Sequence, residues 1–489
     1  MNNLFSLKTE KSQGLFWGIL GVFAMSAYIL GTLYFGQSLL LYFFALLLVF
    51  SSIMIRPASG LYILVICTMW FERHFTLAPV VLNSMTIKLY PIDFVILFLI
   101  ISVAARIIFG GWRFQLKTLD RFILIFGIIC TVGLSVAYIR GLDLSIAFGT
   151  YKNYFLYSVV YFLFAIILRA EEDWQRLMSW FFAGGIGLIF FLAFGLISGY
   201  GLWSEFTPLS TSGDRLLAGT HTFYFVLFFF WLVGLYIWKK KKHGEKWFDS
   251  IWLWIALSLS LGALVVSLVR HLWIAMVFVL VFWLVFLPSF KTRLRYFFLI
   301  VLTAIITTVW LSGYYYSENI LRPGDTSGRI SASQVLKERT DIEYVTSMQD
   351  SSFRWRVSTW KIGYFAWTIS PIFGTGLGYK ISGFDNNWPF TIALREIHND
   401  YLAILFQLGM IGFVVVGIWF LYMCYEFLKN RIILFGENIF KSRLFFFSWS
   451  AILILMVGFS ISVYWDVNLY VIWWWLALAA MRSAIKEHL

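Results

Sequence analysis

The chain has 489 residues, of which 61% are hydrophobic and 13% are charged, and its formal net charge is +13. Because soluble domains carry about 25% charged residues, this composition excludes a soluble enzyme. The apolar runs are continuous rather than alternating, which argues against a membrane β-barrel.

Apolar segments long enough for a helix to cross about 30 Å of hydrocarbon recur along the chain. We predict fourteen of them, with bounds near 14–35, 38–55, 59–71, 91–109, 122–139, 153–169, 177–198, 218–238, 250–268, 271–288, 296–315, 400–425, 444–464 and 467–482. The predicted fold is therefore an all-α polytopic membrane protein with about fourteen transmembrane helices and one large, partly helical extracytoplasmic loop. Residues 1–315 form helices 1–11, residues 316–398 form the loop, and residues 399–489 form helices 12–14. The first apolar stretch is expected to be a span rather than a cleavable signal peptide.

The distribution of positive charge predicts the orientation of these spans. With the N-terminus in the cytoplasm, the cytoplasmic side holds 23 Lys and Arg residues and the outer side holds six, apart from nine in the long loop. Cytoplasmic loops are the ones enriched in Lys and Arg, so both termini are expected in the cytoplasm and the loop faces the periplasm or cell exterior. The lysine run 239–242 is interpreted as a topology anchor at anionic membrane lipids, and no nucleic-acid partner is predicted.

The three cysteines, Cys67, Cys130 and Cys424, all lie inside apolar segments and show no CxxC spacing. We interpret them as small hydrophobic side chains in helix packing, and we predict no metal site and no cofactor.

Three arginines lie at or next to the outer ends of predicted helices: Arg215, Arg270 and Arg356. An arginine at a helix end commonly extends to lipid headgroups, which is one interpretation of each. The other interpretation is phosphate binding, because the planar guanidinium can form two parallel hydrogen bonds to a phosphate group.

Helical periodicity predicts an amphipathic helix over residues 352–369 that ends before Pro371. One face of this helix carries Phe353, Val357, Trp360, Tyr364 and Trp367, and we expect it to be buried. Arg356 lies at the border of that face. Arg354 and Lys361 point away from it and are expected to be solvated.

A turn-rich segment, 371–378, follows this helix and contains Gly374 and Gly376. Its glycines would let backbone amides approach an anion. His398 then begins the twelfth predicted span. It is either a neighbour of the helix cap or a general base, because an imidazole with a pKa near 6.5 accepts protons at neutral pH.

Residues 350–412 resemble the O-antigen ligase and polysaccharide polymerase family of bacterial membrane glycosyltransferases. The matching residues in the C-terminal part are Arg356, Trp360, Pro371, Gly374, Gly376, His398, Asn399, Leu402, Gly409 and Gly412. Ser267 to Arg270 with Trp273, and Arg215 with Gly219 and Thr220, resemble two further elements of that family.

The resemblance implies a metal-independent, inverting glycosyltransferase whose donor is an undecaprenyl-pyrophosphate-linked oligosaccharide and whose acceptor is a glycan. It implies His398 as the general base and Arg215, Arg270 and Arg356 as the pyrophosphate ligands. The supporting residues would be Asn399, which orients the imidazole, Trp360, Gly374 and Gly376.

Two activities occur in such a family. A polymerase joins lipid-linked repeat units in systems such as exopolysaccharide or teichuronic acid synthesis, and a ligase moves the finished glycan to another acceptor. The large number of spans favours the polymerase, with a flippase and a chain-length regulator as candidate partners. A transporter of lipid-linked oligosaccharides is the third hypothesis, although the sequence shows no repeated halves and nearly all charges lie at span ends.

Overall fold

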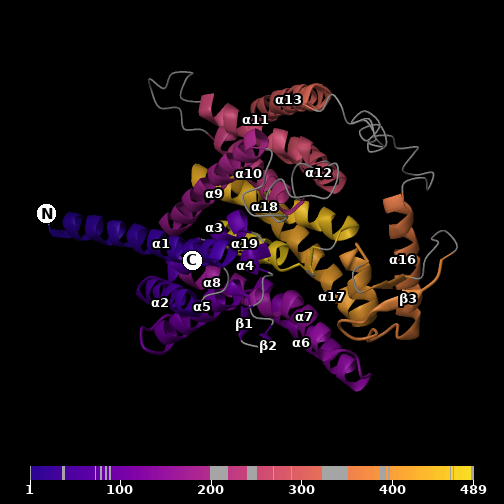
Figure 1. Ribbon diagram of the computed structural model, residues 1–489. Helices are drawn as coiled ribbons and strands as arrows, with labels where there is room; N and C mark the ends of the chain where they lie inside the picture. Colours follow the sequence, from indigo (N-terminus) through magenta and orange to yellow (C-terminus); the bar gives the residue numbers. More distant parts are fainter. Residues whose placement is uncertain are drawn as a thin grey trace. The chain divides into compact units, whose positions relative to one another are not determined.

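The protein is described here by a computed structural model (Figure 1). It describes residues 2–35, 39–71, 73–76, 80–82, 85–87, 90–198, 219–238, 251–267, 269–287, 289–321, 351–385, 392–394, 397–462, 464–465 and 467–485. The chain divides into two compact units. The first comprises Met1–Phe114 and Val160–Ala263, and the second comprises Gln115–Val159 and Leu264–Glu487.

The first unit is built around a helix that is buried along nearly its whole length. Its elements are α1 (Asn2–Phe35), α2 (Leu39–Ile55), α3 (Pro57–Phe71), α4 (Arg73–Thr76), β1 (Val80–Leu82), β2 (Met85–Ile87), α5 (Pro91–Ile108), most of α8 (Val159–Ile167), α9 (Glu171–Ser198), α10 (Gly219–Ile237) and most of α11 (Ile251–Val266). Helix α3 is apolar on all sides and packs against α1, α2, α5 and α9. The backbone N–H of Tyr90 donates to the Asp93 carboxylate (3.0 Å), which fixes the start of α5.

The second unit combines a helical bundle with a small β-hairpin. Its elements are α6 (Thr118–Ile139), α7 (Leu144–Tyr154), the 3₁₀ turn η1 (Leu156–Ser158), α12 (Arg270–Phe286), α13 (Phe290–Leu321), α16 (Ser351–Ile369), β3 (Ile381–Gly383), β4 (Ile392–Leu394), α17 (Asp400–Asn430), the 3₁₀ turn η4 (Arg431–Phe435), α18 (Ile439–Ile461) and α19 (Asn468–Ala484). Helix α17 packs against α6 and α16, and α18 packs against α12 and α19 (Figure 1). Trp419, Trp465 and Trp474 form an aromatic core there, with ring centroids 5.8 to 6.2 Å apart.

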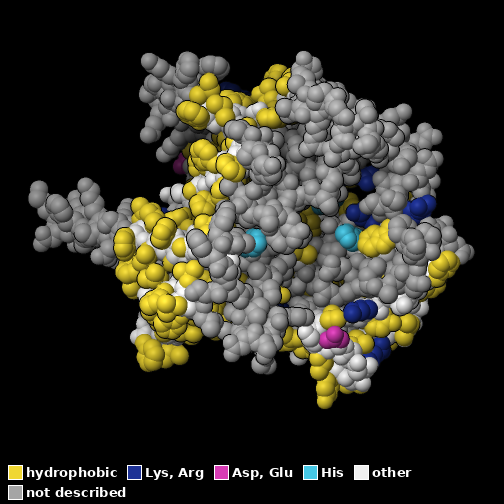
Figure 2. All heavy atoms as spheres, viewed as in Figure 1, with side chains coloured by type: hydrophobic (Ala, Val, Ile, Leu, Met, Phe, Trp, Pro, Cys, Tyr) yellow, Lys and Arg dark blue, Asp and Glu magenta, His cyan; other side chains and the backbone are white. Residues whose placement is uncertain are grey.

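The all-α membrane class is confirmed. Seven helices in the described part of the chain are long and apolar enough to cross a membrane: Gly14–Thr32, Pro91–Ile108, Thr118–Ile139, Glu171–Phe194, Phe290–Trp310, Asp400–Phe435 and Ile439–Ile461. Five shorter apolar helices accompany them, at Leu40–Ile55, Pro57–Phe71, His221–Ile237, Ile251–Leu264 and Arg270–Phe286. Hydrophobic side chains also make up much of the described surface in Figure 2, as expected for a surface that contacts lipid. The number of fourteen spans, the domain boundaries and the orientation remain predictions.

Each predicted apolar segment coincides with one helix except the segment 153–169. There α7 ends at Tyr154, a 3₁₀ turn follows, and α8 begins at Val159. The break places the ring of Phe155 against Gly127 of α6, where a methyl group in place of the glycine hydrogen would lie 2.1 Å from the ring. This packing contact joins positions far apart in the sequence, which explains why the apolar pattern predicted a continuous helix.

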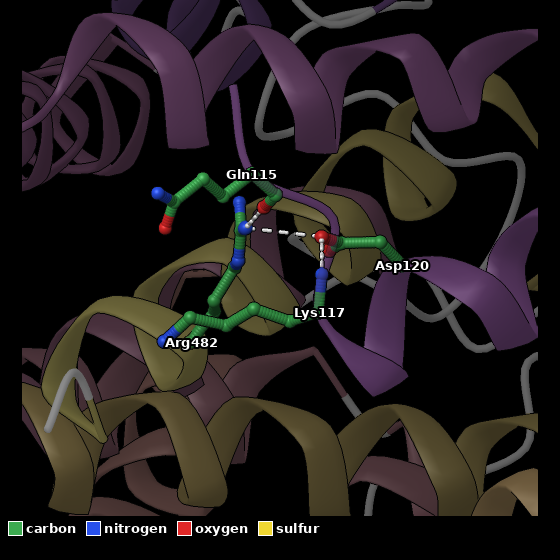
Figure 3. Close-up of polar contacts among 4 residues, drawn as sticks. All are labelled: Gln115, Lys117, Asp120 and Arg482. Carbon is green, nitrogen blue, oxygen red and sulfur yellow. Dashed lines mark hydrogen bonds and ion pairs between the residues drawn. The ribbon is translucent and has the colours of Figure 1, made fainter. Parts of the chain in front are cut away.

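A buried ion pair joins the start of α6 to the last turn of α19 (Figure 3). Nη2 of Arg482 lies 3.0 Å from Oδ2 of Asp120, whose side chain is fully buried. The same nitrogen donates to the carbonyl of Gln115 (2.8 Å), and the backbone N–H of Lys117 donates to Asp120 (2.6 Å). Arg482, counted above as a charge that sets orientation, is therefore also a structural partner of a buried carboxylate.

Candidate functional site

Helix α16 runs from Ser351 to Ile369, as the periodicity predicts, but it buries a different face from the expected one. Tyr364, assigned to the buried face, is 51% exposed. The buried positions are instead the small residues Ser358, Thr359, Gly363 and Ala366, together with Ile362. The expectation was wrong for Tyr364, whereas the other four residues of the expected face are half-buried beside these small residues. Small side chains allow close approach of a neighbouring element, as shown at Gly363, where a Cβ would lie 3.2 Å from Ile397.

The buried face of α16 packs on the hairpin formed by β3 and β4 and on the first turns of α17. Ile362 and Ala366 form one apolar cluster with Ile381 of β3, Ile397, Ala403 and Phe406, and Trp367, Tyr379 and Leu402 lie at its edge. Strands β3 and β4 pair antiparallel, with Ile381 opposite Leu394. This cluster fixes α16 relative to the segment that carries His398.

The cationic side chains of α16 differ in their surroundings. Arg356 is half-buried, as expected at the border of a buried face. Arg354, which was expected to be solvated, is half-buried as well. Lys361 is exposed and pairs with Asp385, with 3.6 Å between Nζ and Oδ1. The hydroxyl of Ser358 donates to the other oxygen of that carboxylate (2.5 Å).

His398 lies between β4 and α17 in a backbone conformation that is rare for its type. Its φ is +53°, and it is the one non-glycine residue with positive φ in the described part of the chain. This left-handed conformation is unfavourable for residues with a Cβ and is concentrated at functional sites. Two tryptophans of α16 hold the segment. Nε1 of Trp360 donates to the carbonyl of Ile397 (3.0 Å), and the ring of Trp355 lies 5.1 Å from the imidazole, edge to face at 80°.

The two residues after His398 begin α17. Asn399 is the N-cap residue, and its side-chain oxygen accepts the backbone N–H of Leu402 (3.0 Å). That oxygen therefore acts as a helix cap, which differs from the expectation that Asn399 orients the imidazole. Asp400 is buried, and its Oδ2 accepts the backbone N–H groups of Tyr464 and Trp465, both at 2.8 Å.

Arg270 is the first residue of α12 and is half-buried. The turn before it is fixed by the carbonyl of Leu264, which accepts the Ser267 hydroxyl (2.7 Å) and Nε1 of Trp273 (2.9 Å). The Ser267 and Trp273 positions of the sequence motif therefore shape the start of α12. His271, the next residue, contacts the hydroxyl of Tyr464 through Nε2 (2.8 Å).

The glycine-rich segment is part of the helical framework. Helix α17 is interrupted at Gly409, where φ is +70° and ψ is −170°, and the segment 371–376 supplies the hydrogen bonds that the helix loses there. The N–H groups of Met410 and Ile411 donate to the carbonyls of Pro371 (2.8 Å) and Ile372 (3.3 Å). In the other direction, the carbonyls of Phe406 and Gln407 accept the N–H groups of Thr375 (2.7 Å) and Gly376 (3.1 Å).

The amides of this segment are therefore used within the protein. Gly374 donates to Ser370, Leu377 donates to the carbonyl of Gly133 in α6, and Gly378 donates to the Gln407 side chain. The expectation that these amides approach an anion is wrong. Gly374 and Gly376 support the site by close packing instead, because a Cβ would lie 2.3 Å from the Gln407 carbonyl at Gly374 and 2.8 Å from the Ala137 amide at Gly376.

The structure thus brings most of the predicted site residues into the second unit. Trp360 of α16 bonds to Ile397, the residue before His398, and Asn399 caps α17. Arg356 lies one turn before Trp360 on α16. Arg270 precedes His271, which is connected to Asp400 through Tyr464. Arg215 lies outside the described residues.

Four residues at the site were not singled out by the sequence: Trp355, Asp400, His271 and Tyr464. Trp355, Asp400 and His271 lie within two positions of a predicted site residue, and this closeness in sequence could have identified them. Tyr464 has no such signal, because 193 positions separate it from His271.

Chemically, the second unit offers an imidazole in a fixed backbone geometry and half-buried guanidinium groups, among them those of Arg270 and Arg356. Such groups can accept a proton and bind a phosphate-bearing ligand. Within the described ranges, no cluster of three or more His, Cys, Asp or Glu side chains is placed to hold a metal ion.

Comparison with known proteins found one similar family. Residues 255–417 match the model of the family described as O-Antigen ligase, a range that includes Arg270, Arg356 and His398. Curated protein sequences gave no match. Over residues 255–417 the chain therefore contains a domain similar to that of the O-antigen ligase family, whose members handle lipid-linked glycans.

Proposed function

We propose that the protein is a cell-envelope polysaccharide polymerase that joins undecaprenyl-pyrophosphate-linked repeat units at the outer face of the cytoplasmic membrane. The observation that carries the proposal is the placement of His398, whose strained backbone is held between α16 and α17 beside Trp355. Strain of this kind costs about 1–3 kcal/mol and persists where the surrounding structure imposes it, commonly at functional sites.

In the proposed reaction His398 takes the proton from a hydroxyl group of the acceptor glycan. The acceptor oxygen then attacks the anomeric carbon of the donor, and the bond between that carbon and the pyrophosphate oxygen breaks. Undecaprenyl pyrophosphate leaves with the electron pair of that bond. A single displacement of this kind inverts the anomeric configuration.

The arginines are proposed to bind the leaving group. Arg270, Arg356 and Arg215 would hold the pyrophosphate and stabilise the negative charge that develops as it departs. Preorganised electrostatic groups of this kind are worth about 3–4 kcal/mol each, and a positioned base contributes about 10²–10⁴-fold. The mechanism needs no metal ion, because the guanidinium groups provide the positive charge.

The geometry of the segment suits a general base. The backbone of residues 397–399 is fixed by the Trp360 hydrogen bond on one side and by the N-cap of α17 on the other. The edge-to-face contact with Trp355 restricts rotation of the imidazole. A base held in this way is preorganised for proton transfer, which lowers the reorganisation needed in the transition state.

The direct test is a reaction with purified protein in liposomes and a lipid-linked single repeat unit, without an ion gradient. A polymerase gives a ladder of longer lipid-linked glycans whose formation stops with His398→Asn. Unchanged repeat units would contradict the polymerase and would favour either the ligase, which needs a different acceptor, or the transporter.

A ligase remains the alternative activity within the same family. The fourteen spans predicted from the sequence favour the polymerase. In a deletion strain, a missing polymerase causes lipid-linked single repeats to accumulate, whereas a missing ligase causes long lipid-linked chains to accumulate. A flippase that delivers repeat units and a regulator of chain length are the proposed partners.

A further inference from the structure

Three polar residues from separate parts of the second unit form a connected chain. Nε2 of His271, in the first turn of α12, lies 2.8 Å from the hydroxyl of Tyr464 in the link between α18 and α19. The backbone N–H of Tyr464 donates to Oδ2 of Asp400 at the start of α17 (2.8 Å). Tyr464 and Asp400 are 1% and 2% exposed, so these bonds are shielded from solvent.

Each end of this series of hydrogen-bonded residues lies next to a residue of the proposed site. His271 directly follows Arg270, and both belong to the first turn of α12. Asp400 is two residues after His398, and Asn399 between them caps the same helix. Tyr464 therefore contacts the first turns of the two helices that present the guanidinium and the imidazole.

We infer that Tyr464 is a positioning residue that sets the spacing between Arg270 and His398. The inference rests on the proposed function. In an inverting displacement the acceptor hydroxyl and the leaving pyrophosphate lie on opposite sides of the anomeric carbon. The base and the pyrophosphate ligand must therefore keep a fixed separation, and a displacement of about 1 Å can cost on the order of 100-fold in rate.

The hydroxyl of Tyr464 can be removed without disturbing the rest of the residue. Its ring stacks on Tyr470, with centroids 3.9 Å apart and planes at 22°. Its bond to Asp400 comes from the backbone and does not depend on the side chain. Phenylalanine keeps both features and loses the contacts of the hydroxyl, which include those with His271 and with the side chain of Tyr470.

Tyr401→Phe is a matched control. Tyr401 directly follows Asp400, and its hydroxyl donates to the carbonyl of Met456 in α18 (2.9 Å). This substitution removes one tyrosine hydrogen bond near the start of α17 and leaves the connection to α12 intact. Tyr401→Phe therefore measures the effect of losing one tyrosine hydrogen bond near the start of α17.

The experiment measures kcat and KM for a lipid-linked repeat unit, together with Tm, for Tyr464→Phe, Tyr401→Phe, His271→Phe and the Tyr464→Phe/His271→Phe double variant. For Tyr464→Phe we expect kcat/KM to fall about tenfold, the equivalent of about 1.4 kcal/mol, while Tm falls no more than in Tyr401→Phe. Tyr401→Phe is expected to keep kcat/KM within about twofold of the wild type.

Two further readouts separate positioning from general stability. His271→Gln retains a polar group toward Tyr464 and is expected to recover most of the activity lost in His271→Phe. The double variant is expected to be no worse than the more impaired single variant, because both remove the same contact.

Wild-type kinetics for Tyr464→Phe, or an activity loss that tracks Tm in all variants, would overturn the inference. His398→Asn is assayed in parallel. If it is also active, the proposed function itself fails, whereas an inactive His398→Asn with an unaffected Tyr464→Phe overturns only the positioning role.

Discussion

The His398 segment, residues 397–400, and the glycine segment, residues 371–378, both contact α17, and both contain positive-φ backbone. The two segments use this positive-φ backbone differently. In the glycine segment the left-handed positions let the backbone fit against Gln407 and Gly409, and its amides donate to carbonyls and a side chain of the protein. In the His398 segment the left-handed residue carries an ionisable side chain, and the neighbouring contacts from Trp355 and Trp360 hold it in place.

This difference separates two reasons why a residue cannot be exchanged. A glycine of the glycine segment is needed because a Cβ would collide with backbone, so its replacement is expected to lower stability. His398 is retained despite its backbone strain, so its replacement is expected to lower activity and leave stability nearly unchanged.

The largest expected effect is on activity at His398. His398→Asn removes the base but keeps a residue type that tolerates the left-handed conformation, so folding is preserved. We expect kcat to fall by at least about 100-fold in the lipid-linked repeat assay. Detergent-solubilised protein should keep its wild-type Tm. A variant that elongates glycans at the wild-type rate would remove His398 from the mechanism.

The next effect is on stability in the glycine segment. Gly374→Ala places a methyl group 2.3 Å from the Gln407 carbonyl at a φ of +76°, so both a collision and backbone strain result. We expect the free energy of unfolding to fall by about 3–4 kcal/mol, from left-handed strain and overpacking combined. Thermal unfolding in detergent measures this loss.

Gly417→Ala is its control, since Gly417 lies in the same helix as Gly409 and a Cβ there meets no atom within 4 Å. An alanine in a helix interior should stabilise by about 0.5–1 kcal/mol. Equal Tm values for the two variants would show that the glycine segment is not packed as described.

A third prediction concerns the ion pair between Asp120 and Arg482, which is neither in the His398 segment nor in the glycine segment. Arg482→Met leaves the buried carboxylate without its guanidinium and should cost about 3 kcal/mol. The Asp120→Asn/Arg482→Met double variant should recover most of that loss, because the amide oxygen still accepts the Lys117 N–H. Activity per folded molecule is expected to stay at the wild-type level in both, and a selective loss of kcat would contradict a purely structural pair.

The smallest effect comes from two tryptophans of α16, each of which donates an indole N–H to one of the two segments. Trp360 donates to Ile397 in the His398 segment, and Trp367 donates to Pro371 in the glycine segment, both at 3.0 Å. Each Phe substitution removes one hydrogen bond worth about 1 kcal/mol. Trp360→Phe should lower kcat about fivefold, whereas Trp367→Phe should lower only Tm. The opposite distribution of effects would reverse the roles assigned to the two segments.

Sequence patterns were sufficient for most of the fold. Long apolar runs predicted the helices because a membrane-spanning segment must satisfy its own backbone hydrogen bonds, which makes its length and hydropathy locally readable. The end of α16 before Pro371 followed from the steric restriction that proline imposes on the preceding residue. His398, Arg356 and Arg270 could be singled out because charged and titratable residues stand out in a chain that is 61% hydrophobic.

Tertiary structure decided which face of α16 is buried, that the glycine amides are used within the protein, and that Asn399 caps α17. It also decided that Phe155 breaks a predicted helix and that Tyr464 connects His271 to Asp400. Each of these outcomes depends on a partner between about 30 and 190 positions away or on a choice between competing hydrogen-bond partners. Local periodicity carries no information about such partners, because the spacing along one helix does not specify which other segment packs against it.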